Sequence, residues 1–480
     1  MKKLRKNMLQ LAFVLCALLL LLIAYGAYTV SVNGNRWYTA TRNEYARNKR
    51  QNVIPGQILD REGRVLAASD AEGNRIYPAE EAQRRATVHA VGVSAFNMKS
   101  SAEYFFSAYL YGAKASFPER LSAALRGEKL RGDTVRLTID AELSACILSQ
   151  FPAGKKGAVV VMNYKTGEVL ADLSFPNFDP ADTASAPEGS SVNRVTQSLT
   201  APGSTFKIVT ATAAMRNMAD WQDRTFLCTG VLQAGNREIT DAGTNRAEGK
   251  LTEHGAVTLK KAFALSCNNT FAQAALEMGD QSLRKTAEEF GFNGQFLFRD
   301  LVVEDSVYPT LNRTEYEIAM TGIGQSALQV TPLHMCMIAG AVANNGLMME
   351  PWMIREAVTS SGGRRASFSA QSYRQVLNVQ EAKVLKEYMR AVITDPSGTG
   401  SRANIPGKTV CGKTGTAELD DPKNPGETIV NAWFVGFLDE EDAPYCLAIM
   451  VENAGEGGGK AAAPVAKSIF SWLLTHEISP

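Results

Sequence analysis

Hydrophobic residues form one long run near the N-terminus, MLQLAFVLCALLLLLIAYGAYTV, from Met8 to Val30. A helix that crosses a bilayer needs about 20 predominantly apolar residues, so this run predicts a membrane span. The basic stretch MKKLRK precedes it, and basic residues favour the cytoplasmic side. We therefore expect residues 1–30 to form a cytoplasmic tail and a single uncleaved anchor, with the later residues outside the membrane. The alternative is a cleaved signal peptide, whose apolar core is usually only about 7–15 residues long.

Residues 31–152 carry shorter and more mixed patterns. Polar and aromatic residues with helical spacing from 31 to 50 predict a helix beside the membrane. Two apolar runs then flank the turn-forming stretch Asp60-Arg61-Glu62-Gly63, which predicts a hairpin. Helix-like runs follow up to about residue 124. We expect residues 31–152 to form a small α+β N-terminal domain, non-catalytic and similar to a pedestal or dimerisation domain.

Residues 153–480 alternate between strand-like and helix-like patterns. The stretch GAVVVMNYKTGEVLADLS predicts a hairpin, residues 211–330 look largely helical, and two further helices are expected at 331–344 and 379–392. Near the C-terminus, VCGKTGTAEL, NAWFVGFLDE and YCLAIMVEN predict three antiparallel strands, with a turn at NPGE after the first, and an apolar helix at 463–474 closes the chain. Strands at both ends with helices between them predict one α/β domain around an antiparallel sheet.

Composition and charge exclude some classes of function. The chain has 45% hydrophobic and 21% charged residues and a net charge of +1, so nothing in its charge favours nucleic acid. None of its seven cysteines falls in a C-x-x-C pair, so the spacing gives no support for a zinc or redox site. We expect mostly buried free thiols, structural roles for the four histidines, and no metal or cofactor. The glycine-rich GEGGGK at 455–460 lacks the pattern of a phosphate loop and predicts a turn.

The stretch APGSTFKIVTATAAM contains a candidate nucleophile and base. Ser204 follows the turn-forming pair Pro202-Gly203 and stands three residues before Lys207, so a helix starting here would place hydroxyl and amine on one face. Apolar neighbours should lower the pKa of that lysine, which suits a general base. The spacing alone is weak evidence, because Ser282 and Lys285 share it within the charged run SLRKTAEEF. Without partners, a helix-capping serine and a solvated lysine would be the better interpretation.

Two later motifs supply such partners. Ser266-Cys-Asn268 ends the apolar run KKAFALS, whereas the other S-x-N matches lie at the membrane edge and in a polar loop. Lys413-Thr414-Gly415-Thr416 begins an apolar, aromatic strand, whereas the other K-T-G match is the turn of the predicted hairpin at 165–167. A cation beside two hydroxyls and an accessible backbone N–H suits an anionic substrate and an oxyanion.

Together, S-x-x-K, S-x-N and K-T-G resemble in order and spacing the motifs of the penicillin-binding transpeptidases. The stretches GAVVVMNYKTGEVLADLSFPNFDP, GIGQSALQVTPLHM and GKTGTAE look like the same family, and GQILDREGRVLA resembles the N-terminal domain of its class B, monofunctional members. The resemblance covers about residues 52–475. It implies the fold shared with serine β-lactamases, in which an antiparallel sheet flanked by helices adjoins an all-α subdomain.

The resemblance also implies a mechanism. Ser204 would attack the penultimate D-Ala of a peptidoglycan stem peptide, and an amine of a neighbouring stem would resolve the acyl-enzyme as a crosslink. Lys207 would take the serine proton, Ser266 would relay a proton to the leaving group, and Asn268 would hold Lys207 and the substrate. Lys413 would supply positive charge, and the hydroxyls of Thr414 and Thr416 would bind the substrate carboxylate, with Gly415 as a further substrate-binding residue. The backbone N–H groups of Ser204 and Thr416 would form the oxyanion hole. β-Lactams should acylate Ser204, without a metal or cofactor.

Other functions remain open at this point. One alternative is a hydrolase on the same site, either a D,D-carboxypeptidase or a β-lactamase. Another is a β-lactam sensor or a catalytically idle scaffold. A sensor would need a cytoplasmic output domain, and only about seven residues precede the predicted span. By resemblance, the expected partner is a SEDS-type membrane glycan polymerase; the sequence does not indicate division, elongation or sporulation.

Overall fold

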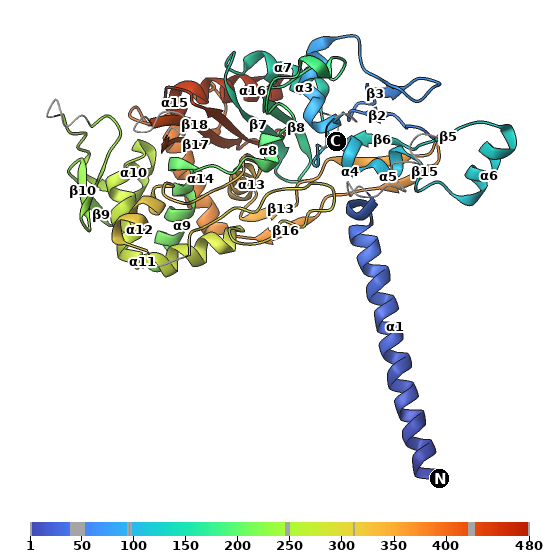
Figure 1. Cartoon of the computed structure of the whole chain (residues 1–480). Coiled ribbons are helices and arrows are strands. Elements are labelled where there is room, and N and C mark those ends of the chain that lie inside the picture. The colour runs from blue at the N-terminus through green and yellow to red at the C-terminus, as the bar shows by residue number, and fades with distance from the viewer. Residues whose placement is uncertain are drawn as a thin grey trace.

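The computed structural model describes residues 2–38, 53–93, 96, 98–244, 250–310, 313–420 and 428–478. One long helix, α1 (Lys2–Tyr38), projects from a folded body that contains the other elements (Figure 1). Its segment Arg5–Thr29 has a mean hydropathy of 2.6 and is not buried in the body, and it is the one described helix long and apolar enough to cross a membrane. The predicted helix at 31–50 is thus present as far as residue 38, and its remainder lies outside the described residues.

A five-stranded antiparallel sheet forms the centre of the body. Its order is β17-β18-β19-β7-β8, with β17 (Val410–Asp420), β18 (Thr428–Leu438), β19 (Tyr445–Glu452), β7 (Lys156–Asn163) and β8 (Val169–Phe175). The predicted C-terminal strands and the predicted hairpin are therefore confirmed, while the NPGE turn lies outside the described residues. The expectation of one sheet with strands from both ends of this region is also confirmed.

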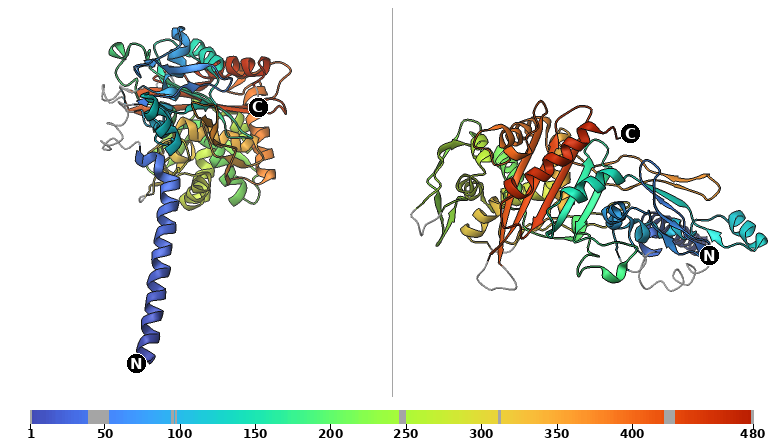
Figure 2. Two further views of the ribbon diagram at one scale, coloured as in Figure 1. Left: turned by 90° about the vertical axis from the view of Figure 1, so that its right-hand side faces the viewer. Right: turned by 90° about the horizontal axis from the view of Figure 1, so that it is seen from above.

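Helices cover both faces of this sheet, as the predicted fold class requires. On one face α13 (Pro332–Ala343) contacts β7, β18 and β19, and all of its residues are buried. On the other, α16 (Ala463–Thr475) lies over the strands and packs against α7 (Ala141–Gln150), as the view from above shows (Figure 2). Because both faces are buried, the central strands are continuously apolar rather than alternating.

A largely helical region packs beside β17. It contains α9 (Lys207–Asn217), α10 (Leu259–Leu265), α11 (Asn268–Phe290), α12 (Glu315–Gly322) and α14 (Val379–Thr394). The prediction that residues 211–330 are largely helical is wrong for residues 225–258. This segment holds the paired strands β9 (Thr225–Cys228) with β12 (Gly255–Thr258) and β10 (Val231–Ala234) with β11 (Arg237–Thr240). Each of these strands has only four residues and most bury one or two side chains, so the apolar pattern is too short to distinguish strand from helix.

The second sheet gathers strands from distant parts of the chain. Its order is β15-β14-β6-β2-β3-β4, with β15 (Arg364–Ser367), β14 (Ile354–Val358), β6 (Thr134–Leu137), β2 (Ile58–Leu59), β3 (Val65–Ser69) and β4 (Arg75–Ile76). The predicted hairpin around Asp60 is the β2–β3 pair. The β14–β15 hairpin, however, follows α13 in the chain and pairs with β6, so the N-terminal and C-terminal regions share a sheet. The division of the chain at residue 152 stays a prediction.

The remaining elements complete these layers. Beside the second sheet lie α3 (Glu81–Val91), α4 (Ala102–Phe105), α5 (Ser107–Leu110), α6 (Phe117–Arg126) and the parallel pair β1 (Val53–Ile54) with β5 (Leu130–Arg131). The paired strands β13 (Leu347–Met349) and β16 (Ser372–Gln375), the helices α8 (Arg194–Gln197) and α15 (Gly458–Ala461), and the 3₁₀ turns η1 (Thr183–Ser185), η2 (Gly203–Phe206) and η4 (Ser401–Ala403) connect them.

Candidate active site

Ser204 and Lys207 lie where a 3₁₀ turn becomes an α-helix. The turn η2 contains Ser204, and Lys207 is the first residue of α9. A 3₁₀ helix has three residues per turn, so side chains at i and i+3 eclipse one another. Ser204 is half-buried and faces a cleft, whereas Lys207 is fully buried. The prediction that Ser204 and Lys207 share one face was based on an α-helix, whereas in the structure a tighter 3₁₀ turn separates them.

Two glycines fix the position of that turn. Gly203 has a φ of +54°, and its N–H donates to the carbonyl of Gly324 at 2.9 Å. Gly324 has a φ of +84°, and a Cβ placed there would lie 1.8 Å from the carbonyl oxygen of Gly203. A left-handed backbone in close contact suits glycine alone. The segment that follows α12 therefore packs against Gly203, the residue before Ser204, and fixes its position.

Ser266 and Asn268 occupy the junction between α10 and α11. Ser266 ends α10 with a left-handed φ of +58°, an uncommon conformation for a residue with a side chain. The next residue, Cys267, caps α11, since its Sγ accepts the N–H of Thr270 at 3.3 Å. Asn268 is anchored on the other side, where its Nδ2 donates to the carbonyl of Thr240 at 3.0 Å. Strained backbone held in place by its surroundings is typical of functional sites.

The two lysines meet at Ser266. Lys207 Nζ donates to the Ser266 carbonyl at 2.7 Å and to Asn268 Oδ1 at 2.8 Å. Lys413 Nζ reaches Ser266 Oγ at 2.8 Å from strand β17 and also donates to the carbonyl of Thr414 at 2.9 Å. The structure thus brings the predicted residues of three separate motifs into one hydrogen-bonded group. Within the described residues, no hydrogen bond joins Ser204 Oγ to this group.

Burial changes the ionisation of both lysines. Loss of solvation lowers the pKa of Lys207 to about 8, although the nearby Cys267 and Asp241 act in the opposite direction. Loss of solvation lowers the pKa of Lys413 well below its usual range, and the positive charge of Lys207 lowers it further. Two buried ammonium groups sharing one hydroxyl disfavour each other, so one of them loses its proton readily. The site can therefore hold a neutral amine near neutral pH.

A cleft of about 1000 Å³ opens over these groups. Ser204, Ser266, Asn268, Thr414 and Thr416 all line it. Strand β17 is an edge strand of the central sheet, so the backbone of Lys413–Thr416 is paired with β18 on one side only. An unpaired strand edge can accept an extended peptide. The cleft is therefore lined by several hydroxyls and by an edge strand, and the buried amines of Lys207 and Lys413 connect to it through Ser266 and Asn268.

The comparisons with known proteins decide the family. Residues 157–471 match the family model described as penicillin binding protein transpeptidase domain. The chain belongs to this family. It is 27% identical over 461 residues to the peptidoglycan D,D-transpeptidase PbpA of Mycolicibacterium smegmatis, covering 90% of each chain, and 30% identical over 399 residues to the peptidoglycan D,D-transpeptidase MrdA of Acinetobacter baumannii, covering 74% of this chain and 56% of that protein.

Solved structures agree with this assignment. The imipenem acyl-enzyme complex of penicillin-binding protein A from M. tuberculosis matches with a TM-score of 0.76 and 25% identity, over 89% of this chain and all of that one. A D,D-transpeptidase domain from Eggerthella lenta matches with a TM-score of 0.73 and 30% identity, over 88% of this chain and 98% of that one. The chain thus has the transpeptidase fold that its sequence predicted, and the expected resemblance to class B members is confirmed.

The residues set aside at the sequence level lie outside the transpeptidase cleft. Ser282 and Lys285 are on α11, where Lys285 is exposed, and Lys165 is an exposed turn residue between β7 and β8. All seven cysteines are free. His334 bonds Ser306 Oγ and the Phe290 carbonyl in the core, which agrees with the structural role expected of it.

Other residues of the cleft escaped the motif search. The stretch 455–460 predicted as a turn borders the cleft, and α15 begins within it. Gln325 Nε2 donates to the Thr416 carbonyl at 3.4 Å, and the hydroxyl of Thr399 lies 2.6 Å from that of Thr414. Asp241 accepts a short hydrogen bond from the backbone N–H of Asn268. The signal for Gln325 was present in GIGQSALQVTPLHM, while isolated threonines and aspartates give none.

A substitution at Gly324 should disturb this transpeptidase site through packing. Gly324→Ala adds both left-handed strain and a clash with Gly203, and we expect it to lower the free energy of unfolding by about 3 kcal/mol or more. Gly362 is a matched control, because its φ is +87° but open space surrounds its Cβ position. Gly362→Ala should cost only about 1 kcal/mol. Urea unfolding of the three proteins in one detergent measures both values, and equal losses would contradict the packing argument.

Proposed function

We propose that the chain is a membrane-anchored peptidoglycan D,D-transpeptidase that works through an acyl-enzyme on Ser204 and is acylated there by β-lactams. The observation that carries the proposal is one cleft of a penicillin-binding transpeptidase fold that is lined by Ser204, Ser266 and Asn268. The buried amines of Lys207 and Lys413 hydrogen-bond to Ser266 and Asn268 in its wall. Relatives of this fold carry imipenem and penicillin G as acyl-enzymes. The purified chain should accordingly retain a fluorescent penicillin through denaturing electrophoresis; an unlabelled chain would contradict the proposal.

Acylation begins at the Ser204 hydroxyl. Its oxygen attacks the carbonyl carbon of the penultimate D-Ala, and its proton passes to the neutral amine of Lys207. The oxyanion that forms lies between the backbone N–H groups of Ser204 and Thr416, and such donors are each worth about 10²–10³-fold in rate. The contact of Gln325 with the Thr416 carbonyl holds the backbone of this residue in place.

The Ser266 hydroxyl protonates the leaving group. The bond to terminal D-Ala breaks, and the Ser266 hydroxyl donates a proton to its amine while Lys413, at 2.8 Å, replaces that proton. Thr414 and Thr416 bind the terminal carboxylate, and this negative charge favours the ammonium form of Lys413, whose pKa burial and Lys207 otherwise lower. Gly415 lets the strand approach the backbone of Pro202 and the side chain of Thr205, so it holds the strand against the turn before Ser204.

The proton that Lys207 took from Ser204 then passes to Lys413 through Ser266 Oγ, which lies 3.4 Å from Lys207 Nζ and 2.8 Å from Lys413 Nζ. An amine of a second stem peptide attacks the ester and gives its proton to the neutral Lys207, which returns it to the Ser204 oxygen as the crosslink is released.

The rate of acylation should rise with pH through the titration of Lys207. The base must be neutral, and with a pKa of about 8 it is mostly protonated at pH 7. The second-order rate constant with penicillin G should therefore increase about tenfold between pH 7 and pH 9 and level off above that. Stopped-flow measurement in one buffer mixture gives the profile, with hydrolysis of free penicillin subtracted. A flat profile or one that falls with pH would exclude Lys207 as the base.

The orientation in the membrane is part of the proposal. The candidate span lies at the N-terminus after the basic stretch MKKLRK, which supports a cytoplasmic N-terminus and an extracytoplasmic catalytic domain. In intact cells, a protease added outside the membrane should degrade the domain; complete protection with the outer layers permeable would contradict this orientation.

We also propose a membrane protein partner for the chain. Helix α6 presents Phe117, Leu121 and Leu125 on one face, and their exposed fractions are 74%, 45% and 79%. Exposed apolar side chains at helical spacing indicate a protein-binding face. We assign it, together with the anchor, to a SEDS-type glycan polymerase. Photo-crosslinking from Leu125 should capture that polymerase, and crosslinks found only to lipid would contradict the assignment.

A further inference from the structure

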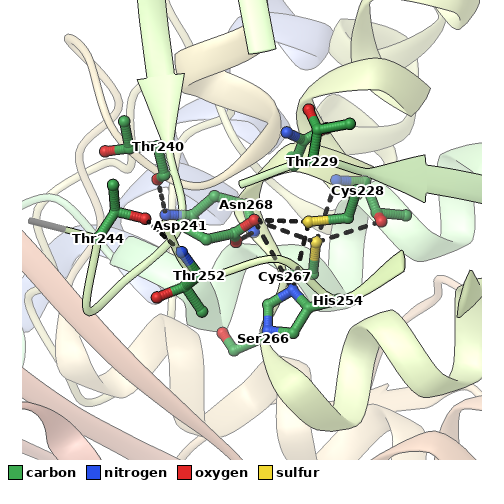
Figure 3. A network of polar contacts seen from close by, with 12 residues as sticks. Cys228, Thr229, Thr240, Asp241, Thr244, Thr252, His254, Ser266, Cys267 and Asn268 are labelled. Atoms are coloured by element: carbon green, nitrogen blue, oxygen red, sulfur yellow. Dashed lines mark hydrogen bonds and ion pairs between the residues drawn. The ribbon is translucent and has the colours of Figure 1, made fainter. Parts of the chain in front are cut away.

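Four potential metal ligands converge beside the cleft, and the proposed reaction uses none of them. They are Cys228 at the end of β9, Asp241 directly after β11, His254 directly before β12, and Cys267 between α10 and α11. Their ligand atoms all lie within 4.8 Å of one another. Figure 3 shows both sulfur atoms, one carboxylate and the imidazole ring pointing toward a common point.

The distances in this cluster fit a tetrahedral metal site. Asp241 Oδ2 lies 3.0 Å from Cys228 Sγ, 3.5 Å from Cys267 Sγ and 3.7 Å from His254 Nδ1. Cys228 Sγ lies 3.4 Å from the same nitrogen. Ligands around a tetrahedral zinc ion are separated by about 3.4–3.8 Å, given Zn–S bonds of about 2.3 Å and Zn–N or Zn–O bonds of about 2.0–2.2 Å. A zinc ion would fit with small side-chain movements.

Burial gives a second reason for a cation here. Cys228, Asp241 and Cys267 are each at most 3% exposed. A buried carboxylate needs a positive or hydrogen-bonding partner. Asp241 accepts hydrogen bonds from the Asn268 N–H and from the two thiols, but among the described residues His254 is the only basic side chain within 4.0 Å of it. A divalent cation would neutralise the carboxylate and the two thiolates in one place.

The kind of ligands selects the metal. Thiolates with imidazole and one carboxylate in a tetrahedral arrangement suit Zn²⁺, whereas Mg²⁺ and Ca²⁺ prefer oxygen ligands alone. Four protein ligands leave no position for water or substrate, which is the mark of a structural site. Binding would release the two thiol protons.

The cluster is joined directly to the catalytic loop. Cys267 is the middle residue of Ser266-Cys267-Asn268, and the second carboxylate oxygen of Asp241 accepts the N–H of Asn268. A metal held by these two residues would fix the left-handed backbone of Ser266 and the side chain of Asn268 toward Lys207. We propose that Cys228, Asp241, His254 and Cys267 bind a structural Zn²⁺ that positions the Ser266–Asn268 loop. These four are positioning residues, and the site does not depend on the proposed reaction.

Zinc content tests the site. The full-length chain, purified in detergent without chelators, should contain about one zinc per chain by mass spectrometry of the elements. Cys146→Ser, a control in α7 away from the cluster, should keep that content. Cys228→Ser should lose most of it, and so should Asp241→Asn, which keeps an acceptor for the Asn268 N–H but loses the charge. A wild-type chain that stays metal-free after incubation with Zn²⁺, or variants that hold as much zinc as the control, would overturn the proposal.

Two measurements on the wild-type chain remain informative if a variant fails to fold. At a urea concentration that exposes the buried thiols of the zinc-free chain, Zn²⁺ should slow the alkylation of Cys228 and Cys267, with Cys146 as the internal reference, and a chelator should remove that protection. A Cys228–Cys267 disulfide, or alkylation unaffected by Zn²⁺, would contradict the site. Removal of zinc should also slow acylation by penicillin, and Zn²⁺ but not Mg²⁺ should restore the rate. Unchanged acylation by the zinc-free chain would contradict the positioning role.

Discussion

Ser204→Ala is expected to abolish covalent labelling by penicillin while leaving the fold intact. The adduct is an ester on the serine oxygen, so no acyl-enzyme can form without it, and loss of a serine nucleophile has cost about 10⁶-fold in rate in another serine enzyme. The side chain is half-buried and its hydroxyl makes no hydrogen bond to the lysine group, so alanine should be tolerated. Intact-mass analysis after incubation with penicillin G measures the adduct.

The control for this experiment lies in the same chain. Ser282 has a lysine at the same spacing but sits on α11, away from the cleft. Ser282→Ala should label like the wild type. An adduct that survives in Ser204→Ala, or is lost in Ser282→Ala, would contradict the assignment of the nucleophile.

Lys207→Met should lower the acylation rate by about 10²–10⁴-fold, the usual contribution of a general base. Methionine fills a similar volume but leaves the Ser266 carbonyl and Asn268 Oδ1 without their donor, at a cost of about 1–3 kcal/mol in stability. Rates of penicillin acylation, followed by mass, give the kinetic effect, and Lys285→Met is the exposed control.

Lys207→Arg separates the role of base from that of charge. An arginine stays protonated and cannot accept the serine proton, although it keeps a positive charge. We expect this variant to be as slow as Lys207→Met. Acylation close to the wild-type rate with arginine would show that Lys207 supplies charge alone, and the proposed proton transfer would be wrong.

Local context in the sequence distinguished residues of the candidate site from similar motifs elsewhere in the chain. The Pro202-Gly203 turn distinguishes Ser204 from Ser282, because it starts a buried turn rather than an exposed helix face. The strand character around Lys413 distinguishes it from the turn residue Lys165 in the same way. Each distinction depends on residues adjacent in the chain, which periodicity and turn chemistry can reveal. The central sheet and its covering helices were predictable for the same reason.

Features made by distant segments were not predictable. The β14–β15 hairpin joins the N-terminal sheet through pairing with β6, and no local pattern specifies which strand a hairpin will meet. The cluster at Asp241 escaped the cysteine spacing test because its four residues are far apart in the chain and none belongs to a metal-binding motif. Cys267 was visible only as the variable position of Ser266-x-Asn268. Its burial and its neighbours emerge when the strands β9–β12 fold against α10 and α11.

Crosslinking of glycan strands tests the central claim most directly. The full-length chain should be incubated with glycan polymerised from lipid-linked precursor carrying D-Ala-D-Ala stems, and the digested products should be separated by mass. We predict crosslinked stem dimers with the wild type and none with Ser204→Ala, with one D-Ala released per crosslink formed. Release of D-Ala without dimers would indicate a carboxypeptidase, and dimers formed by Ser204→Ala would contradict the account.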